Sequence, residues 1–460
     1  MTALSETKRY QAYPEYKDSG VEWLDDIPKD WCTRRLKHML ESPMSYGANE
    51  AAERAVSTEP RYIRITDMNS DGTLKEDTFR SLPRDIASDY LLKDRDILLA
   101  RSGATVGKSF IYRKEFGDCC FAGYLIKVSC DSARLNSDYA FWFFQSSSYW
   151  QYISGSQIQA TIQNVSAEKY GEMYISLPEH VEEQTQIANF LDHETAKIDT
   201  LIEKQQQLIK LLKEKRQAVI SHAVTKGLNP RAPMKDSGVE WLGEVPEHWV
   251  ASRLKYYTKQ IVDGAHFTPT YTESGVPFLR VTDIQGKSID LSQIKYIPQA
   301  EHNELIKRCN PQKGDLLLSK NGTIGVPKLV DWDWDFSIFV SLCLLKFKEQ
   351  LSAEYAEYFF RSHELKEQIF GLIKQSTVIN LHLDKIQNFW FCIPPRTEQD
   401  EIVTSLNRDI GKLDLLINKA TDAINLMKER RAALISAAVT GKIDVRNWQA
   451  PTPQSFEQIA

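Results

Sequence analysis

The stretch KDSGVEWLDDIPKDWCTRRLK, residues 17–37, decides the organisation of the chain, because it returns at residues 235–255 as KDSGVEWLGEVPEHWVASRLK. Four further segments return in the same order: YIRITDM as FLRVTDI, DILLARSGATVG as DLLLSKNGTIG, DYAFWFFQS as EYAEYFFRS, and KEKRQAVISHAVTKG as KERRAALISAAVTGK. Repetition that keeps this order indicates a repeated architecture rather than chance similarity. The sequence therefore predicts two copies of one structural unit.

Each copy joins a region of short β-rich and helical runs to a long helix with a seven-residue apolar repeat. The first region predicts a mixed α/β (α+β) globule. Heptads sustained over several turns are typical of a coiled coil, and two helices with the same repeat pair most simply with each other. The expected core positions of that coil are Leu191, Ile198, Leu201, Leu208, Leu212, Val219, Leu406, Leu413, Leu416, Met427 and Leu434.

The fold predicted from these patterns is therefore two pseudo-repeated globular domains separated by two long antiparallel coiled-coil helices. Pro178 and Pro395 precede the helices, and Gly227 and Gly441 follow them, as helix boundaries require. The expected ranges are a first domain at 1–180, a central helix at 181–227, a second domain at 228–396, a distal helix at 397–445 and a C-terminal tail at 446–460.

The bulk composition limits the classes of function. A net charge of −5 over 460 residues argues against a general polyanion-coating protein, so a nucleic-acid surface has to be local. Seven cysteines without a C-x-x-C pair predict neither a disulfide framework nor a zinc ribbon. No apolar run has the roughly 18 residues of a membrane span, and the N-terminus lacks the apolar segment of a signal peptide. We expect a cytoplasmic protein that does not bind a membrane.

The loop RSGATVGKS, residues 101–109, resembles a phosphate-binding loop but has one residue too few between its glycines. In the second copy the same loop reads SKNGTIGVPK, with Val and Pro where Lys and Ser or Thr would be needed. A run of β-formers that ends in glycine turns instead predicts strand–turn–strand. We expect the glycines to adopt positive φ angles and to leave Arg101 and Lys320 exposed beside them.

Catalytic motifs are missing elsewhere too. The string IPPRT lacks the polar head and the aromatic residue of an amino-methyltransferase motif, FAGYL lacks the second glycine of a cofactor turn, and the nine histidines have no metal-ligand spacing. The sequence predicts no catalytic residue, no metal site and no bound cofactor.

The string KDSGVEWLGEVPEHW, followed by a globule, a proline turn and a heptad helix that ends in KERRAALISAAVTGK, resembles the specificity subunit of type I restriction–modification enzymes. The resemblance covers essentially the whole chain. It implies two target recognition domains that each read one half of an asymmetric, split site in double-stranded DNA, with the helices setting the gap. It also implies two modification subunits that methylate adenine at N6 with S-adenosylmethionine, and two restriction subunits that use ATP and magnesium. Bacterial or archaeal origin follows from the same resemblance.

Base-reading residues are expected where the two copies differ, since shared residues serve folding, backbone contacts or partners. The divergent segments 42–54 and 261–275 contain groups suited to base edges. Cations that both copies share are candidates for phosphate contacts. For Arg64 and Arg280, a salt bridge to Asp67 or Asp283 explains the pattern equally well. Polar turns at 156–164 and 374–380 are expected near DNA or the modification subunit. The candidates are Tyr46, Asn49, Arg64, Arg101, Lys108, Gln159, His266, Thr268, Tyr271, Arg280, Lys320 and Lys374.

Basic turns near the ends of both long helices, at Lys213–Arg216 and Lys428–Arg431, are a further candidate contact to the phosphates between the half-sites. Basic residues also suit the C-terminal half of any helix.

Two other classes of function are open to the sequence. A scaffold whose coil joins two protein-binding globules fits the acidic net charge. An NTP-driven enzyme rests only on GATVGKS and predicts that Lys108→Ala abolishes turnover.

Overall fold

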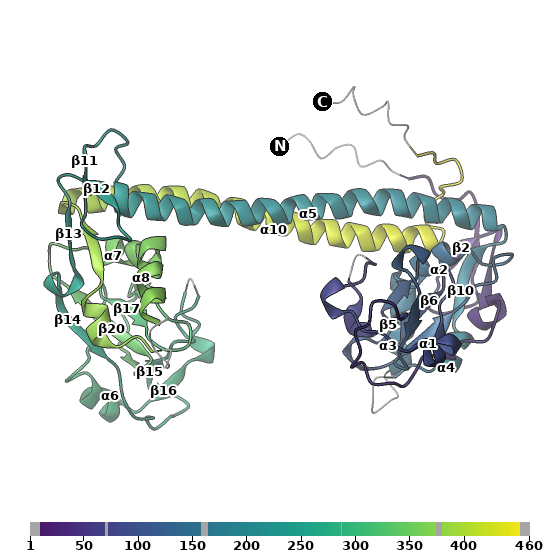
Figure 1. The fold of residues 1–460 in the computed structure, drawn as a ribbon, viewed down its shortest axis with the longest axis horizontal. Coiled ribbons are helices and arrows are strands. Elements are labelled where there is room, and N and C mark those ends of the chain that lie inside the picture. Colours follow the sequence, from purple (N-terminus) through teal and green to yellow (C-terminus); the bar gives the residue numbers. More distant parts are fainter. Residues whose placement is uncertain (1–9, 70–71, 158–163, 287, 374–379, 451–460) are drawn as a thin grey trace. The chain divides into compact units, whose positions relative to one another are not determined.

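The computed structural model describes residues 10–69, 72–157, 164–286, 288–373 and 380–450. The chain divides into two compact units (Figure 1). Unit 1 comprises residues 1–205 and 423–460, and unit 2 comprises residues 206–422.

Unit 1 is built around an antiparallel four-stranded sheet with the order β4-β9-β6-β7, beside a parallel pair, β5-β8. Two antiparallel pairs, β1-β2 and β3-β10, complete it. Its strands are β1 (Tyr16–Asp18), β2 (Asp26–Pro28), β3 (Trp31–Arg35), β4 (Ser45–Tyr46), β5 (Arg61–Ile63), β6 (Ile97–Ala100), β7 (Ser109–Ile111), β8 (Cys119–Phe121), β9 (Leu125–Val128) and β10 (Tyr174–Pro178). Its short helices are α1 (Arg84–Ala87), α2 (Ser137–Phe143), α3 (Ser147–Gln157) and α4 (Ala167–Glu172).

Unit 2 repeats this plan with the sheet β14-β20-β17-β18, in which all pairs are antiparallel, and the sheet β16-β15-β19, in which β15 and β19 are parallel. Its strands are β11 (Met234–Asp236), β12 (Glu244–Pro246), β13 (Val250–Arg253), β14 (Thr258–Asp263), β15 (Val276–Leu279), β16 (Lys295–Ile297), β17 (Leu316–Ser319), β18 (Pro327–Leu329), β19 (Ser337–Ile338), β20 (Leu342–Phe347) and β21 (Trp390–Ile393). Its short helices are α6 (Gln299–Leu305), α7 (Ala353–Arg361), α8 (His363–Ile373) and α9 (Leu383–Gln387).

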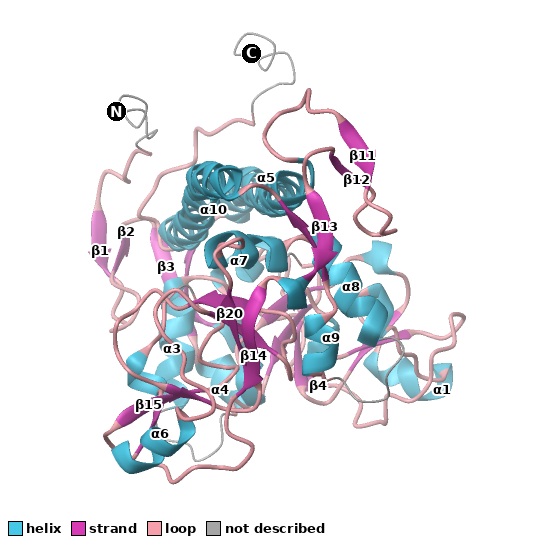
Figure 2. Cartoon of the chain, turned by 90° about the vertical axis from the view of Figure 1, so that its left-hand side faces the viewer, coloured by secondary structure: helices cyan, strands magenta, loops and turns pink. Residues whose placement is uncertain are grey.

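The main core of each unit lies between the four-stranded sheet, the short helices and the two long helices, α5 (Val181–Lys226) and α10 (Arg396–Val439). In unit 2, α7 lies between the long helices and the sheet in both views (Figures 1 and 2). Buried tyrosines join the layers. The Tyr139 hydroxyl lies 2.7 Å from the Ser176 carbonyl oxygen and 3.0 Å from that of Val439. Tyr355 makes the equivalent contacts in unit 2, to the carbonyl oxygens of Val224 and Cys392.

The long helices end where glycine allows a left-handed turn. Gly227 has a φ of 75° and Gly441 a φ of 71°. The Lys442 amide donates a 2.8 Å hydrogen bond to the Ala437 carbonyl oxygen, which closes α10 in the manner of a Schellman turn. The second long helix therefore ends at Val439, whereas the sequence predicted that it would extend to residue 445.

Within each unit, parts of α5 and α10 pack antiparallel with a heptad seam. One rung of the seam follows the prediction: the structure buries Leu191, Ile198, Leu212, Leu406 and Leu413 and partly buries Val219, Met427 and Leu434. The other rung differs. Leu201, Leu208 and Leu416 are 51%, 42% and 49% exposed, so their assignment to the core was wrong.

The second rung lies four residues after the first, at Ile202, Ile209 and Arg216 in α5 and at Ile410, Ile417 and Ile424 in α10. Spacings that alternate four and three keep a seam on one side of each helix. Both neighbours are apolar at Leu201–Ile202, Leu208–Ile209 and Leu416–Ile417, and only the packing of the two helices decides which of them lies in the seam.

Among the helices in the described part of the chain, none is both long and apolar enough to cross a membrane.

Candidate nucleic-acid interface

The strand registers align the two units residue by residue at the edge of the four-stranded sheet. In unit 1, Tyr46 of β4 and Leu99 of β6 both lie opposite Ile126 of β9. In unit 2, Asp263 of β14 and Leu318 of β17 both lie opposite Cys343 of β20. Tyr46 and Asp263 therefore occupy equivalent positions, as do Arg101 and Lys320, which follow β6 and β17.

A Gly-Ala dipeptide follows Tyr46 and Asp263 in both units. A Cβ atom on Gly47 would lie 2.2 Å from the Phe121 carbonyl oxygen, and one on Gly264 would lie 1.9 Å from that of Ile338. Neither position tolerates a side chain, because real Cβ atoms do not approach backbone this closely. The dipeptide fixes the path of the chain, and the next residue, Asn49 or His266, is exposed in both units.

In unit 1 the equivalent pair is a cation over an aromatic ring. The Arg101 guanidinium lies 4.6 Å from the centroid of the Tyr46 ring, and the Tyr46 hydroxyl accepts a 3.0 Å hydrogen bond from the Ala167 amide. Arg101 has no carboxylate partner among the residues that the structure describes. Its charge, held in place by the ring and half-buried, is available to an anionic ligand.

In unit 2 the same two positions form a buried ion pair, Lys320 Nζ to Asp263 Oδ2 at 2.8 Å. His266 Nε2 lies 3.0 Å and Arg308 Nη2 lies 2.5 Å from the other carboxylate oxygen. Burial by itself would raise the pKa of Asp263, but the hydrogen bonds from Lys320 and His266 and the charge of Lys320 lower it to about 2. Three nitrogen groups thus surround one carboxylate.

The expectation that Lys320 is exposed was wrong, since it is only 4% exposed. The cause is Asp263, which ends β14, two strands away across β20 in the same sheet, and draws the ammonium group into the protein. The exposed cation of this cluster is Arg308, three residues after the end of α6, with its side chain 54% exposed. It was not among the sequence candidates, and the contact spans 45 residues of sequence.

The shared RITD and RVTD turns are closed by their own side chains. Arg64 donates from its guanidinium to both oxygens of Asp67, at 3.0 and 2.8 Å, and Asp67 also accepts from the Arg64 amide. Arg280 and Asp283 repeat the arrangement at 3.2 Å for both guanidinium contacts. The structure thus contains the salt bridge that was the alternative to a phosphate contact for both arginines.

The glycine loops form turns between antiparallel strands, as the sequence predicted. Gly103, Gly107, Gly322 and Gly325 all have φ between 70° and 85°. Lys108 Nζ donates a 2.9 Å hydrogen bond to the Met68 carbonyl oxygen, and burial followed by the nearby charge of Lys75 lowers its pKa. This hydrogen bond joins two loops of unit 1, so Lys108 has a structural role that does not depend on a bound nucleotide.

The remaining candidates are Thr268, Tyr271, Gln159 and Lys374. Thr268 and Tyr271 are exposed beside His266, and the Tyr271 ring packs edge-on against Phe278. Gln159 and Lys374 lie outside the described residues. Asn164 forms a bridge with Ser102, and Asn380 forms one with Asn321, so both of these described residues lie beside a glycine loop. Sequence reasoning missed Tyr124 and Phe267, which are 64% and 55% exposed.

One arginine in the basic segment of each long helix is paired with an acid. Arg431 Nε lies 2.9 Å from Asp199 Oδ1 in unit 1, and Arg216 Nε lies 3.2 Å from Asp414 Oδ1 in unit 2. Arg431 is also stacked 5.6 Å from the centroid of the Trp142 ring. Across the described ranges, no group of three or more His, Cys, Asp or Glu side chains is placed to hold a metal ion.

Comparison with known proteins identifies the family of this chain. The family model described as "Type I restriction modification DNA specificity domain" matches residues 28–211 and 265–425, one match in each copy. The specificity subunit of the type I restriction enzyme EcoKI of Escherichia coli K12 is 25% identical over 374 residues, 79% of this chain and 77% of its own length. A putative MjaX specificity subunit of Methanocaldococcus jannaschii is 24% identical over 446 residues, 95% of this chain and 99% of its own.

Solved structures share the fold. A chain from a study of complex assembly and conformational transition of the type I R-M system superposes with a TM-score of 0.72 at 15% identity, covering 91% of this chain and 99% of that one. The HsdS subunit of Thermoanaerobacter tengcongensis gives a TM-score of 0.53 at 17% identity, covering 91% and 98%.

Proposed function

This chain belongs to the type I restriction–modification DNA specificity family, and from that premise we propose that it is the subunit that selects the DNA sequence for its complex. Each unit reads one half of a split, asymmetric site. The two long helices, each of which runs from one unit into the other, set the number of base pairs between the halves. Catalysis belongs to the partners: two modification subunits methylate adenine at N6 with S-adenosylmethionine, and two restriction subunits use ATP and magnesium.

One observation carries the proposal: the two units keep one backbone and change the side chains at the same places. Tyr46, Asn49 and Arg101 stand where unit 2 has Asp263, His266 and Lys320. A shared scaffold with different polar groups at its surface is what two readers of different base sequences require, because bases are distinguished by donors and acceptors. Asn49 suits adenine, to which an amide can make two hydrogen bonds, and the half-buried Arg101 and the exposed Arg308 suit phosphates or guanine.

The experiment is to express the chain with its modification subunit in a methylation-free host and to map modified adenines across the genome. We expect one split motif with a fixed gap. A complex that purifies intact but leaves the genome unmethylated would overturn the proposal and favour the scaffold. Asn49→Ala and His266→Ala form a matched pair: each should relax the sequence of one half-site only, at a cost of roughly 1–3 kcal/mol against the preferred base.

A further inference from the structure

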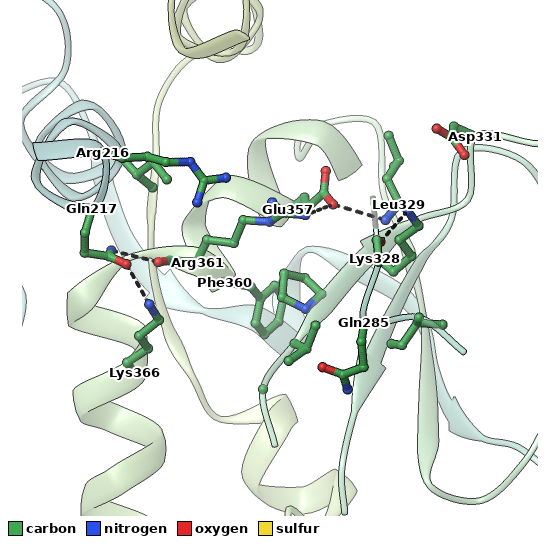
Figure 3. Close-up of a pocket in the computed structure, with 16 residues that line it drawn as sticks. Arg216, Gln217, Gln285, Lys328, Leu329, Asp331, Glu357, Phe360, Arg361 and Lys366 are labelled. Carbon is green, nitrogen blue, oxygen red and sulfur yellow. Dashed lines mark hydrogen bonds and ion pairs between the residues drawn. The ribbon is translucent and has the colours of Figure 1, made fainter. Parts of the chain in front are cut away.

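A hollow of about 530 Å³ in unit 2 lies between α5, α7, α8, β18 and the turn after Arg280. Four cations and two acids line it: Arg216, Lys328, Arg361 and Lys366, with Asp331 and Glu357 (Figure 3). All of these residues lie within unit 2.

Polar and acidic contacts hold the cations in place, and with Asp414, which pairs with Arg216, four cations face three acids. Gln217 accepts a 2.6 Å hydrogen bond from Lys366 Nζ and donates one of 2.8 Å to the Arg361 carbonyl oxygen (Figure 3). Arg361 Nη2 pairs with Glu357 at 2.6 Å, while its Nε is buried and lacks a hydrogen-bond partner in the described part of the chain. Burial, and then the charges of Arg216 and Arg361, lower the pKa of Lys366. Cations that crowd one another in this way favour a bound anion.

The corresponding corner of unit 1 is different. The repeat that ends at Ser146 and Ser362 puts Gln145 at the position of Arg361 and Trp150 at that of Lys366, and Ala432 stands for Gln217. Phe110 replaces Lys328, since Leu98 pairs with Phe110 as Leu317 pairs with Lys328. The hollow there is lined by the carboxylates of Glu115, Asp192 and Asp199 against the cations Arg113 and Arg431.

This difference indicates which partner the hollow serves. Two equivalent modification subunits would dock through features that both units share, such as the paired arginines of the long helices. A cationic hollow that is confined to one unit instead suits a partner whose two halves differ. The DNA, with its two different half-sites, is such a partner. The hollow also adjoins both loops of the candidate interface, through Ile284–Gly286 after the RVTD turn and Gly325–Leu329 after the glycine turn.

We propose that this hollow of unit 2 binds a backbone phosphate of the DNA, with Lys366 and Arg361 as donors, and that unit 1 has no counterpart. The inference rests on the proposed function. A phosphate group fits a site built from planar guanidinium and flexible ammonium donors, and such contacts orient the duplex without reading its sequence.

The test uses the complex with its modification subunit and a duplex that carries the mapped site. Lys366→Gln should lower the affinity for that duplex by roughly tenfold. The slope of log K against log salt should become less negative by about 0.9, the value for one lost phosphate contact. The methylated motif should not change. Arg361→Gln is the second variant, and Lys412→Gln, an exposed lysine of α10 in the same unit, is the charge-matched control with an unchanged slope.

A neutral methylphosphonate placed at successive positions of the duplex locates the contact. We expect one position that weakens binding of the unsubstituted complex and has no further effect on the Lys366→Gln complex. Unchanged slopes in both variants, with correct methylation by the unsubstituted complex, would refute the phosphate site and leave the proposed function standing. Loss of the modification subunit on purification of either variant would overturn it in favour of a protein carboxylate.

Discussion

The two units place different side chains at the same structural positions, with opposite effects on the exposure of the cation. In unit 1, Arg101 lies over the ring of Tyr46, half-exposed and without a carboxylate. In unit 2, Lys320 is buried against Asp263, and the exposed charge belongs to Arg308, three residues after the end of α6. The sheet beneath is the same. The comparison teaches that a domain can move its surface charge from one loop to another without changing its strands, provided that a buried pair replaces the exposed cation.

The comparison is tested most directly by removing Asp263 and Tyr46, the side chains that contact the cation in each unit. Asp263→Ala leaves Lys320 buried without its carboxylate, which costs about 3–5 kcal/mol. Tyr46→Ala removes only a half-exposed cation–π contact, worth about 0.5–1 kcal/mol. Hydrogen exchange on peptides from β14 and β17, and from β4 and β6, measures each unit separately. Equal losses in the two variants would show that the two positions are not energetically different.

Acid should separate the units next. The folded pKa of Asp263 is about 2, below the 3.8 of a free carboxyl. A depressed pKa gives stability that is full above the unfolded value and is lost as pH falls, here between about 4 and 2, and amounts to roughly 2 kcal/mol. Denaturant unfolding at stepped pH should show a loss in the natural chain that exceeds the loss in Asp263→Asn by roughly 2 kcal/mol. Equal losses in the two proteins would place the titrating group elsewhere.

Where the units agree, paired changes should agree too. Tyr139→Phe and Tyr355→Phe each remove a hydroxyl that bonds a carbonyl oxygen of a long helix, Val439 or Val224. Each should cost about 1 kcal/mol, the usual net contribution of a hydrogen bond. Hydrogen exchange near the C-terminal ends of α10 and α5 provides the measurement. A clear difference between the two variants would mean that the joints between helix and globule are not equivalent.

The smallest effect is expected at Leu201 and Leu416, which occupy equivalent exposed positions on α5 and α10. Serine at either site should change the free energy of unfolding by less than about 0.5 kcal/mol, because neither side chain lies in the seam. Leu191→Ala, at a fully buried position, is the control and should cost about 2–5 kcal/mol. A large effect at Leu201 would restore it to the core.

Much of the fold was accessible from the sequence because the chain repeats itself. The repeat set the two units, and proline and glycine placed the starts of both long helices and the end of α5. The second rung of the coil was not accessible, since Leu201 and Ile202 are equally apolar and a shift of one residue turns a helix by about 100°. Only the packed pair of helices decides which of them faces the partner.

The site was harder to predict than the fold. Arg101 and Lys320 align in sequence and look alike, yet 57 residues separate Lys320 from the acid that buries it. Tyr46 and Asp263 share no chemistry, so nothing in their types suggests equivalence. The signal in the sequence is the Gly-Ala dipeptide that follows each residue, within YGAN and DGAH. Gln159 and Lys374 remain predictions.

That dipeptide has a consequence for how new specificities arise. Gly47 and Gly264 pass so close to a neighbouring carbonyl oxygen that no other residue fits, while the positions on either side hold Tyr or Asp and Asn or His. A sterically fixed glycine between positions that hold different residues in the two units is a natural boundary for diversification. Selection, or a combinatorial library, can vary the flanking residues while the crossing of the chain preserves the register of both sheets. The recognition surface can therefore evolve in small steps without passing through unfolded ancestors.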